Sequence, residues 1–217
     1  MIKKRLFVLL FGMFIFKPAL ANAAKSYGSP DEMMTYYYQN KDINHALKII
    51  QQISDAEILE HQPQAFTPLV GFVLGVIKEN ADAEEQIHNL TLSPTMQKCV
   101  AIAEDLSAKY SFEEILTDPN KIQDERGLDL LWGVFFATGN PKIPETIHAF
   151  VENNKISKAP AGQKSRQDIV VMSAIWSLES NAQQHEIVKP YAEFPAQLDG
   201  NGSQNIITFY QEAKKHR

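Results

Sequence analysis

The sequence predicts an all-α protein in which antiparallel helix hairpins stack as a short, irregular α-solenoid. Three observations support this fold class. Helix-start signals recur along the chain, apolar residues return every three to four positions after them, and no stretch of comparable length alternates with a period of two. The expected helices lie near residues 30–39, 43–53, 55–61, 64–79, 82–90, 94–109, 111–117, 126–138, 142–153, 166–181, 184–193 and 203–215.

The first 23 residues predict a cleavable signal peptide. Basic residues at positions 3–5 precede an apolar run of 11 residues from Leu6 to Phe16, and Ala21 and Ala23 supply the small residues that a signal peptidase reads. We therefore expect residues 1–23 to be removed by cleavage after Ala23.

A transmembrane anchor is the alternative interpretation of this segment. Spanning a bilayer takes about 20 apolar residues, whereas this run is interrupted by Lys17 and Pro18. The only cysteine, Cys99, is far from the cleavage site, which excludes a lipid-modified N-terminus. The mature protein is expected in the periplasm of a Gram-negative bacterium or secreted from it, without an integral membrane segment.

Residues 24–217 are expected to form a single all-helical domain, since a chain of this length can enclose a sizeable core. The signal carries four positive charges and no acidic residue, so its removal changes the formal net charge from −5 to −9. Such an acidic protein is not expected to bind nucleic acid or anionic membranes. With one cysteine it forms no internal disulfide, so its stability must come from packing.

Two kinds of sequence mark the helix starts. A serine followed by proline occurs at Ser29-Pro30 and Ser93-Pro94, and the S-x-x-E spacing of a capping box occurs from Ser54 to Glu57 and from Ser111 to Glu114. In both patterns the serine oxygen accepts a hydrogen bond from a free backbone amide of the first turn.

The single cysteine is expected in the core. Cys99 shares helical spacing with Met96, Val100 and Ala103, which predicts one buried face. No neighbouring residue would lower the pKa of the thiol, so the sequence favours a packing role over a nucleophile.

Three matched helix pairs suggest an internal repeat. Phe72, Trp132 and Trp176 precede Ile87, Ile147 and Tyr191 by one shared interval, and precede Leu90, Phe150 and Phe194 by a second. Each unit reads as an apolar first helix followed by a shorter amphipathic helix. The first two units are farther apart along the chain than the last two, and this uneven spacing leaves two alternatives open: true repeats, or coincidences of an all-helical chain.

The middle pair has the most apolar first helix. Between residues 126 and 138 the sequence is apolar around most of the helix, so this helix should be covered on several sides. We expect Trp132 to be a buried anchor that packs against the second helix of its own pair, near Ile147 or Phe150.

Two segments resemble known helical proteins. The string from Leu128 to Gly139, LDLLWGVFFATG, resembles a segment of uncharacterised bacterial exported proteins of helical-repeat type. More broadly, the three tyrosines at 36–38, followed by Ala46 and Ile50, resemble the helix pairs of tetratricopeptide-like arrays. The expected solenoid is thus of a tetratricopeptide- or HEAT-like type. The resemblance implies the fold and transfers no activity.

The sequence assigns no catalytic, cofactor-binding or metal-binding residue. The six histidines are His45, His61, His88, His148, His185 and His216, and none has metal-ligand spacing. His88 and His148 hold equivalent places in two helix pairs, which allows a paired site, although histidines at a helix edge more often face water.

Acidic residues are the other candidates for chemistry. Neighbouring pairs occur at Glu84-Glu85, Glu113-Glu114 and Asp124-Glu125, but adjacent residues on a helix point about 100° apart and do not converge on a substrate. The stretch from Asp199 to Ser203 begins like a calcium loop, but Gln204 and Tyr210 stand where the loop needs glycine and glutamate. A flexible turn before a Ser203 N-cap is the favoured interpretation.

Two function classes remain. The favoured class is a non-catalytic, exported protein-interaction or scaffold domain, because helical arrays present extended surfaces. The alternative is a periplasmic or secreted hydrolase whose carboxylate pair is assembled by the fold. We expect a protein partner, with at least one of Tyr36, Tyr37 and Tyr38 exposed as part of a binding surface.

Overall fold

The computed structural model describes residues 29–118, 122–154, 156 and 164–193. In this part of the chain every regular element is a helix, so the predicted all-α class is confirmed. The α-helices are α1 (Pro30–Thr35), α2 (Ile43–Asp55), α3 (Ile58–His61), α4 (Phe66–Glu79), α5 (Ala83–His88), α6 (Pro94–Lys109), α7 (Phe112–Thr117), α8 (Glu125–Thr138), α9 (Lys142–Asn153) and α10 (Arg166–Ala182). Short 3₁₀ helices are η1 (Tyr37–Gln39), η2 (Pro63–Ala65) and η5 (Glu186–Tyr191).

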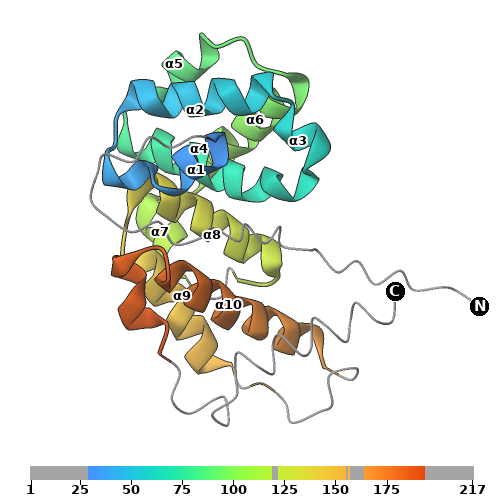
Figure 1. Ribbon diagram of the computed structural model, residues 1–217, viewed down its shortest axis with the longest axis vertical. Helices are drawn as coiled ribbons and strands as arrows, with labels where there is room; N and C mark the ends of the chain where they lie inside the picture. The colour runs from blue at the N-terminus through green and yellow to red at the C-terminus, as the bar shows by residue number, and fades with distance from the viewer. Residues whose placement is uncertain (1–28, 119–121, 155, 157–163, 194–217) are drawn as a thin grey trace, which may run out of the picture.

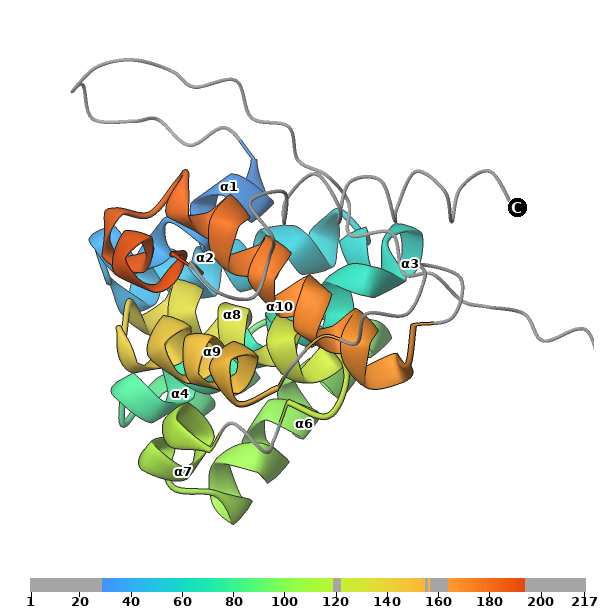
Figure 2. The ribbon, with the colours of Figure 1, turned by 90° about the horizontal axis from the view of Figure 1, so that it is seen from below.

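Helices α4 and α8 form the centre of the molecule. Figure 1 shows α2 above α4, α8 in the middle, and α9 and α10 below. Seen from below, α10 and α9 cover α8, while α6 and α7 lie at one edge (Figure 2). Helices α5, α6 and α7 lie between α4 and α8 along the chain. The fold therefore depends on a contact between helices that are distant in sequence.

Glycines bring α4 and α8 into backbone contact. A Cβ atom on Gly71 would lie 2.1 Å from the carbonyl oxygen of Leu130, and one on Gly133 would lie 1.9 Å from that of Pro68. Gly75, one turn after Gly71, faces the methyl group of Ala137. Because the contacts advance along both helices together, α4 and α8 run in the same direction with almost no side chain between them.

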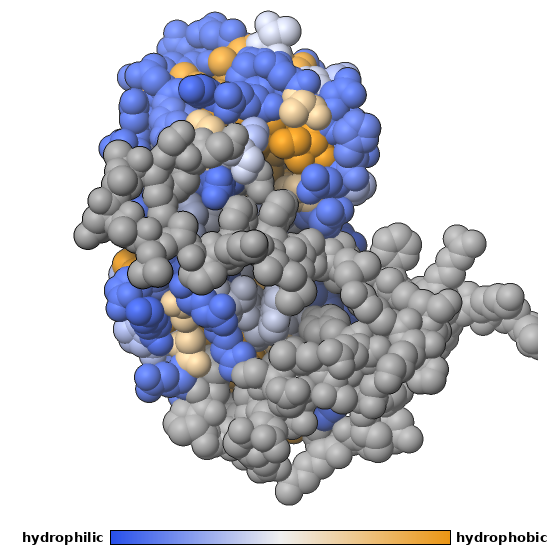
Figure 3. Space-filling view, viewed as in Figure 1, coloured by the Kyte–Doolittle hydropathy of each residue, from blue (hydrophilic) through white to orange (hydrophobic). Residues whose placement is uncertain are grey.

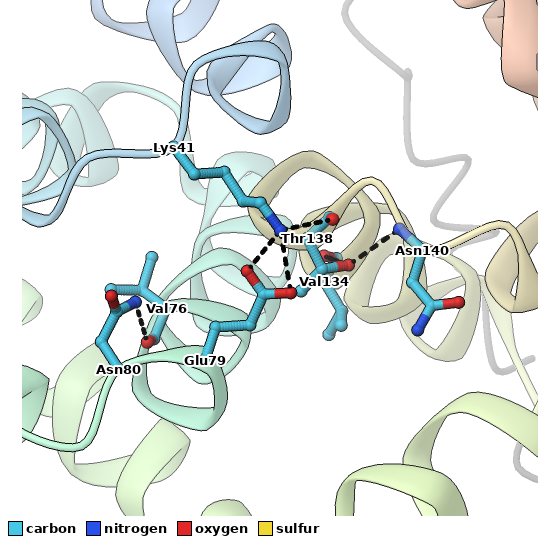
Figure 4. Close-up of polar contacts among 7 residues, drawn as sticks. All are labelled: Lys41, Val76, Glu79, Asn80, Val134, Thr138 and Asn140. Carbon is cyan, nitrogen blue, oxygen red and sulfur yellow. Dashed lines mark hydrogen bonds and ion pairs between the residues drawn. The ribbon is translucent and has the colours of Figure 1, made fainter.

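Lysine 41 joins the C-terminal ends of these two helices. Its Nζ donates to Glu79 Oε1 at 3.1 Å and Oε2 at 2.9 Å at the end of α4, and to the carbonyl oxygen of Thr138 at 3.3 Å at the end of α8 (Figure 4). The last carbonyls of a helix lack intrahelical donors, so this ammonium satisfies part of that need.

The predicted core faces are confirmed. The buried residues of α2 include Ala46, Ile49, Ile50 and Ile53, which return at helical spacing. Cys99 is buried in α6 with Met96, Val100 and Ala103, as predicted. Burial raises the pKa of the Cys99 thiol to about 12, which agrees with a packing role.

The helix-start predictions succeed at two serines. Ser93 Oγ accepts from the backbone amide of Met96, and Ser111 forms a complete capping box with Glu114. Ser29 holds the N-cap position of α1, but its side chain makes no capping hydrogen bond.

The capping box predicted from Ser54 to Glu57 is wrong. Helix α2 continues through Ser54 to Asp55, and Ser54 Oγ accepts a hydrogen bond from the backbone amide of Ser93 at 2.7 Å. Glu57 then adopts a left-handed conformation with φ 50°, which breaks the helix before α3. The tertiary contact to Ser93 therefore prevails over the local capping pattern.

Several predicted boundaries shift. The helix expected at 30–39 divides into α1 and η1, and the one expected at 55–61 is reduced to α3. Within the segment expected at 184–193, Glu186–Tyr191 forms the 3₁₀ helix η5, and Pro190 lies inside it. The predicted signal peptide, the helix at 203–215 and the loop from Asp199 to Ser203 lie outside the described residues.

Helix pairs occupy the three predicted places: α4 with α5, α8 with α9, and α10 with η5. Among the described residues, no helix combines the length and apolar character needed to cross a bilayer.

Candidate functional site

An apolar groove lies between α3 and the start of α6. It has a volume of about 410 Å³ and is lined by Leu59, Pro63, Phe66, Pro94, Thr95 and Lys98. Figure 3 shows a group of hydrophobic residues on the upper right of this face, near the place of α3 in Figure 1. An apolar hollow surrounded by polar surface is the kind of feature that protein partners use.

Local sequence explains why this groove is held open. Pro63 and Pro94 have fixed φ angles and each begins a helical element, so both rims have little backbone freedom. The walls are also joined across the chain, because Ser54 Oγ accepts from the backbone amide of Ser93. The groove is therefore formed before any ligand arrives.

The two charged residues next to the apolar floor differ in their partners. Glu60 interacts with the hydroxyl groups of Thr95 and Ser93, and these hydrogen bonds lower the pKa of its carboxyl group below the usual range. Lys98 is exposed and forms no ion pair with any described residue. Its ammonium is the charged group in the groove lining, which favours a ligand that carries negative charge next to an apolar group.

A second hollow lies beside the α10–η5 turn, on a different part of the molecule. It has a volume of about 400 Å³ and is lined by Tyr38, Gln39, Ala182, Gln183, Gln184, His185, Glu186, Ile187 and Lys189. Glu186 is the carboxylate of this lining, and it is ion-paired with Lys189. The hollow therefore does not present a pair of free carboxylates.

His185 is buried at the inner edge of this hollow. Its ring lies within 5.3 to 5.7 Å, centroid to centroid, of the rings of Tyr36, Tyr38, Phe135 and Phe136. Only 1% of the residue is exposed, and this enclosure lowers the pKa of the imidazole to about 4.

The hydrogen bonding of His185 is incomplete. Nδ1 lies 3.0 Å from the hydroxyl of Tyr38, while the buried Nε2 has no hydrogen-bond partner among the described residues. The Tyr38 ring is positioned partly by Gly139, because a Cβ atom there would lie 2.5 Å from Tyr38 Cδ2. We call the five rings of Tyr36, Tyr38, Phe135, Phe136 and His185 the aromatic box.

The two histidines that the sequence placed in equivalent positions bind different partners. His88 Nε2 lies 2.8 Å from Oε1 of Glu104 of α6. His148 Nδ1 bonds the carbonyl oxygen of Tyr191 at 2.9 Å, and its Nε2 lies 3.3 Å from Glu152. Among the described residues, no group of three or more histidine, cysteine or acidic side chains could hold a metal ion.

The acidic pairs lie at helix starts, as their positions suggested. Glu84 and Glu85 fall in the first turn of α5, and Glu113 and Glu114 in that of α7. Asp124 is the N-cap of α8, followed by Glu125. Charges there complement the helix dipole, and none of these pairs lines either hollow.

The expected exposure of the tyrosines is wrong. Tyr37 is buried against Phe72, with ring centroids 5.3 Å apart, while Tyr36 and Tyr38 are half-buried in the aromatic box. At the change from α1 to η1, Tyr37 turns toward Phe72, while Tyr36 and Tyr38 both turn toward His185.

Neither Lys98 nor His185 was predicted from the sequence as a site residue. Lys98 belongs to a regular helix, and it lines the groove only because α3 lies beside that helix. His185 meets Tyr38, which is 147 positions away in sequence, so no local spacing could reveal the contact. The tyrosine run was the one usable signal.

Comparisons of the chain with protein-family models, curated proteins and solved structures find no match.

Proposed function

We propose that this protein is a non-catalytic binding domain that holds a peptide segment of a protein partner in the groove between α3 and α6. The segment places an aliphatic or aromatic side chain on the apolar floor and an adjacent carboxylate beside Lys98. The observation that supports this proposal is an exposed ammonium with no described acidic partner at the rim of a preformed apolar hollow.

Both terms of the interaction have a physical basis. Burying an apolar side chain contributes about 25 cal/mol per Å² of area removed from water. A carboxylate near Lys98 adds a modest, salt-sensitive attraction that selects the register of the peptide. The groove changes little on binding, because Pro63 and Pro94 already fix its rims.

A peptide array tests the proposal. Each peptide carries one apolar residue next to aspartate, and its matched copy carries asparagine there. The wild-type protein should retain the aspartate peptides preferentially. Lys98→Glu should abolish that preference, whereas Lys48→Glu, the same charge reversal on the exposed side of α2, should keep it. Equal binding of both peptide series, or an unchanged preference in Lys98→Glu, would overturn the proposal.

A small anionic probe gives a second measurement. Anilinonaphthalene sulfonate combines an apolar ring system with one negative charge, so it should bind the groove of the folded protein. Reversing the charge of Lys98 should weaken its binding about fivefold at low salt, while Lys48→Glu leaves it unchanged. Competition by the best aspartate peptide shows that probe and peptide share the groove.

We also propose that the domain acts outside the cytoplasm. The basic, apolar and small-residue pattern of residues 1–23 supports export, and the periplasm or the medium is the expected location. N-terminal sequencing of exported material should begin at Ala24 or within a few residues of it. An intact Met1 in a membrane fraction would contradict cleavage.

The solenoid interpretation is likewise a proposal. It is supported by the order of the helix pairs, since α4 and α5 are followed along the chain by α8 and α9, and then by α10 and η5. It predicts that each pair buries its apolar faces against the next pair, with the groove at one end of the array.

A further inference from the structure

The aromatic box joins three parts of the chain that are distant in sequence. Tyr36 and Tyr38 come from the N-terminal segment at 29–40, Phe135 and Phe136 from α8, and His185 from the turn between α10 and η5. Two side-chain hydrogen bonds link the N-terminal segment to this turn. Tyr36 donates to Gln184 Oε1 at 3.4 Å, and the hydroxyl of Tyr38 lies 3.0 Å from His185 Nδ1.

The box suits a neutral imidazole. One ring nitrogen faces a hydroxyl and the other has no hydrogen-bond partner among the described residues, so a proton added to the ring would place a charged N–H where no acceptor waits. The rings that face His185 from the N-terminal segment are phenols, and those from α8 are phenylalanines, so none supplies a negative charge. On η5, Glu186 is paired with Lys189 and both are exposed.

We propose that His185 is an acid-sensitive clamp: protonation of its ring releases the segment at 29–40 from the α10–η5 turn while the α4–α8 pair stays folded. Release is local because the glycine contacts that hold α4 against α8 lie outside the box and contain no titratable group. An exported protein meets the pH of its surroundings, so such a clamp would make the Tyr36 and Tyr38 surface available in acid.

The size of the effect follows from linkage. Burial holds the pKa of His185 at about 4, whereas a solvated histidine has a pKa near 6.5, so the folded state binds the proton less readily than the opened state. The stabilisation of the closed form is complete above pH 6.5 and is lost as pH falls toward 4. Between pH 7 and pH 5 the opening equilibrium should increase about twentyfold.

Hydrogen exchange of the full chain tests the clamp, after correction for intrinsic exchange rates. The reporting amides are Gln39 and Asn40, which donate to carbonyls within the N-terminal segment, and Val188, which donates to the carbonyl of His185. Amides inside α4 and α8 are the reference. In the wild-type protein, the reporting amides should lose protection about twentyfold from pH 7 to pH 5, with no equal loss in α4 and α8. Equal loss in all of them would mean global unfolding and would overturn the proposal.

Variants separate His185 from other titrating groups. His185→Gln keeps a hydrogen-bonding group for Tyr38 but cannot gain a charge, so its reporting amides should lose the pH dependence. His88→Gln, which changes an exposed histidine, should keep it. Both variants are compared in an Asp129→Asn background, because burial raises the pKa of Asp129 to about 7 and its titration acts on α8 in the opposite direction.

A measurement on the unaltered protein covers the case in which His185→Gln does not fold. The ring signals of His185 in NMR spectra should keep the neutral chemical shift down to pH 5. A ring that titrates above pH 6 with no loss of protection would show that the box accepts the proton, and would overturn the proposal.

Discussion

Two sides of α8 are packed in opposite ways. On one side Gly133 lets the backbone of α4 approach so closely that a methyl group would not fit. On the other side Phe135 and Phe136 extend toward His185, and the space is filled by large rings around a polar group. The contact with α4 is close because glycine has no side chain, whereas the contact with His185 is filled by large aromatic side chains.

This difference in packing indicates what each contact is sensitive to: an added methyl group or a change of protonation. A backbone contact has no rotamers with which to adjust, so the α4–α8 pair responds to one added methyl group. The aromatic box contains a buried nitrogen on His185 that has no hydrogen-bond partner among the described residues, so the proposed clamp makes the stability of the box depend on protonation. The glycine contact contains no titratable side chain, whereas the proposed clamp makes the box conditional on pH.

The largest expected effect is at Trp132, which belongs to the ring side of α8. Its ring lies 5.5 Å from that of Phe135 and 6.3 Å from that of Phe136, and the residue is 3% exposed. Trp132→Ala should lower the free energy of unfolding by about 3 to 5 kcal/mol, measured by thermal or urea denaturation. Ile147→Ala should cost about 2 to 5 kcal/mol and couple to Trp132 in a double-mutant cycle.

Trp132→Phe is the matched control. It keeps an aromatic ring and removes an indole N–H that has no hydrogen-bond partner among the described residues, so it should cost less than half as much as alanine. An alanine variant with an unchanged melting temperature would contradict the buried-anchor role.

The next effect tests the glycine side. Gly133→Ala should destabilise by about 3 kcal/mol, because its new methyl group would meet the Pro68 carbonyl oxygen. Gly75→Ala should cost less, because its nearest obstacle is the Ala137 methyl group at 2.6 Å rather than backbone. Alanine raises helix propensity by about 1 kcal/mol, so stabilisation by either variant would show that the two helices can separate without cost.

These two sides also show how far sequence can predict the structure. Periodicity and the serines at 93 and 111 located most helices, because capping and amphipathicity are local. Gly71 and Gly75 are visible in the sequence, but the residues that they meet on α8, such as Leu130 and Ala137, lie far along the chain. The capping box predicted at Ser54 is wrong because the Ser54 hydroxyl accepts a hydrogen bond from the backbone amide of Ser93 instead. The groove and the aromatic box were beyond prediction, since each brings together segments that are far apart in the sequence.

A smaller effect is expected at Asp129 of α8, where the cost of burying a charge can be measured separately from packing. Burial, with Glu125 and Asp124 nearby, raises the pKa of Asp129 to about 7. The folded state thus binds this proton more tightly than the unfolded state, so stability falls as pH rises from about 4 to 7. Asp129→Asn mimics the protonated acid and should stabilise by about 1 to 2 kcal/mol at pH 8, a value reduced because the residue is partly exposed.

The measurement is denaturant unfolding at pH 4 and pH 8. The gain should vanish at pH 4, where the wild-type carboxyl group is already protonated in the folded protein. An equal gain at both pH values would assign the effect to packing or helix propensity instead of charge.

The smallest effect concerns Lys41, which bonds both central helices where the glycine contact ends (Figure 4). Its side chain is 42% exposed and that of Glu79 is 27% exposed, so the ion pair alone contributes at most about 1 kcal/mol. The two partners are not equivalent, however. The lysine lies at the C-terminal ends of two helices, where positive charge is favourable, while Glu79 places negative charge at the unfavourable end of α4.

Lys41→Gln should therefore cost about 1 kcal/mol, and Glu79→Gln close to nothing, when unfolding is measured at low salt. Raising the salt concentration should shrink the difference, because both charges are accessible to solvent. If Glu79→Gln is instead as costly as Lys41→Gln, the ion pair itself holds the helix ends together and the carbonyl of Thr138 adds nothing. Equal costs would mean that the contact between the C-terminal ends of α4 and α8 depends on charge, as is proposed for the aromatic box. Only the glycine contacts between the two helices would then be independent of charge.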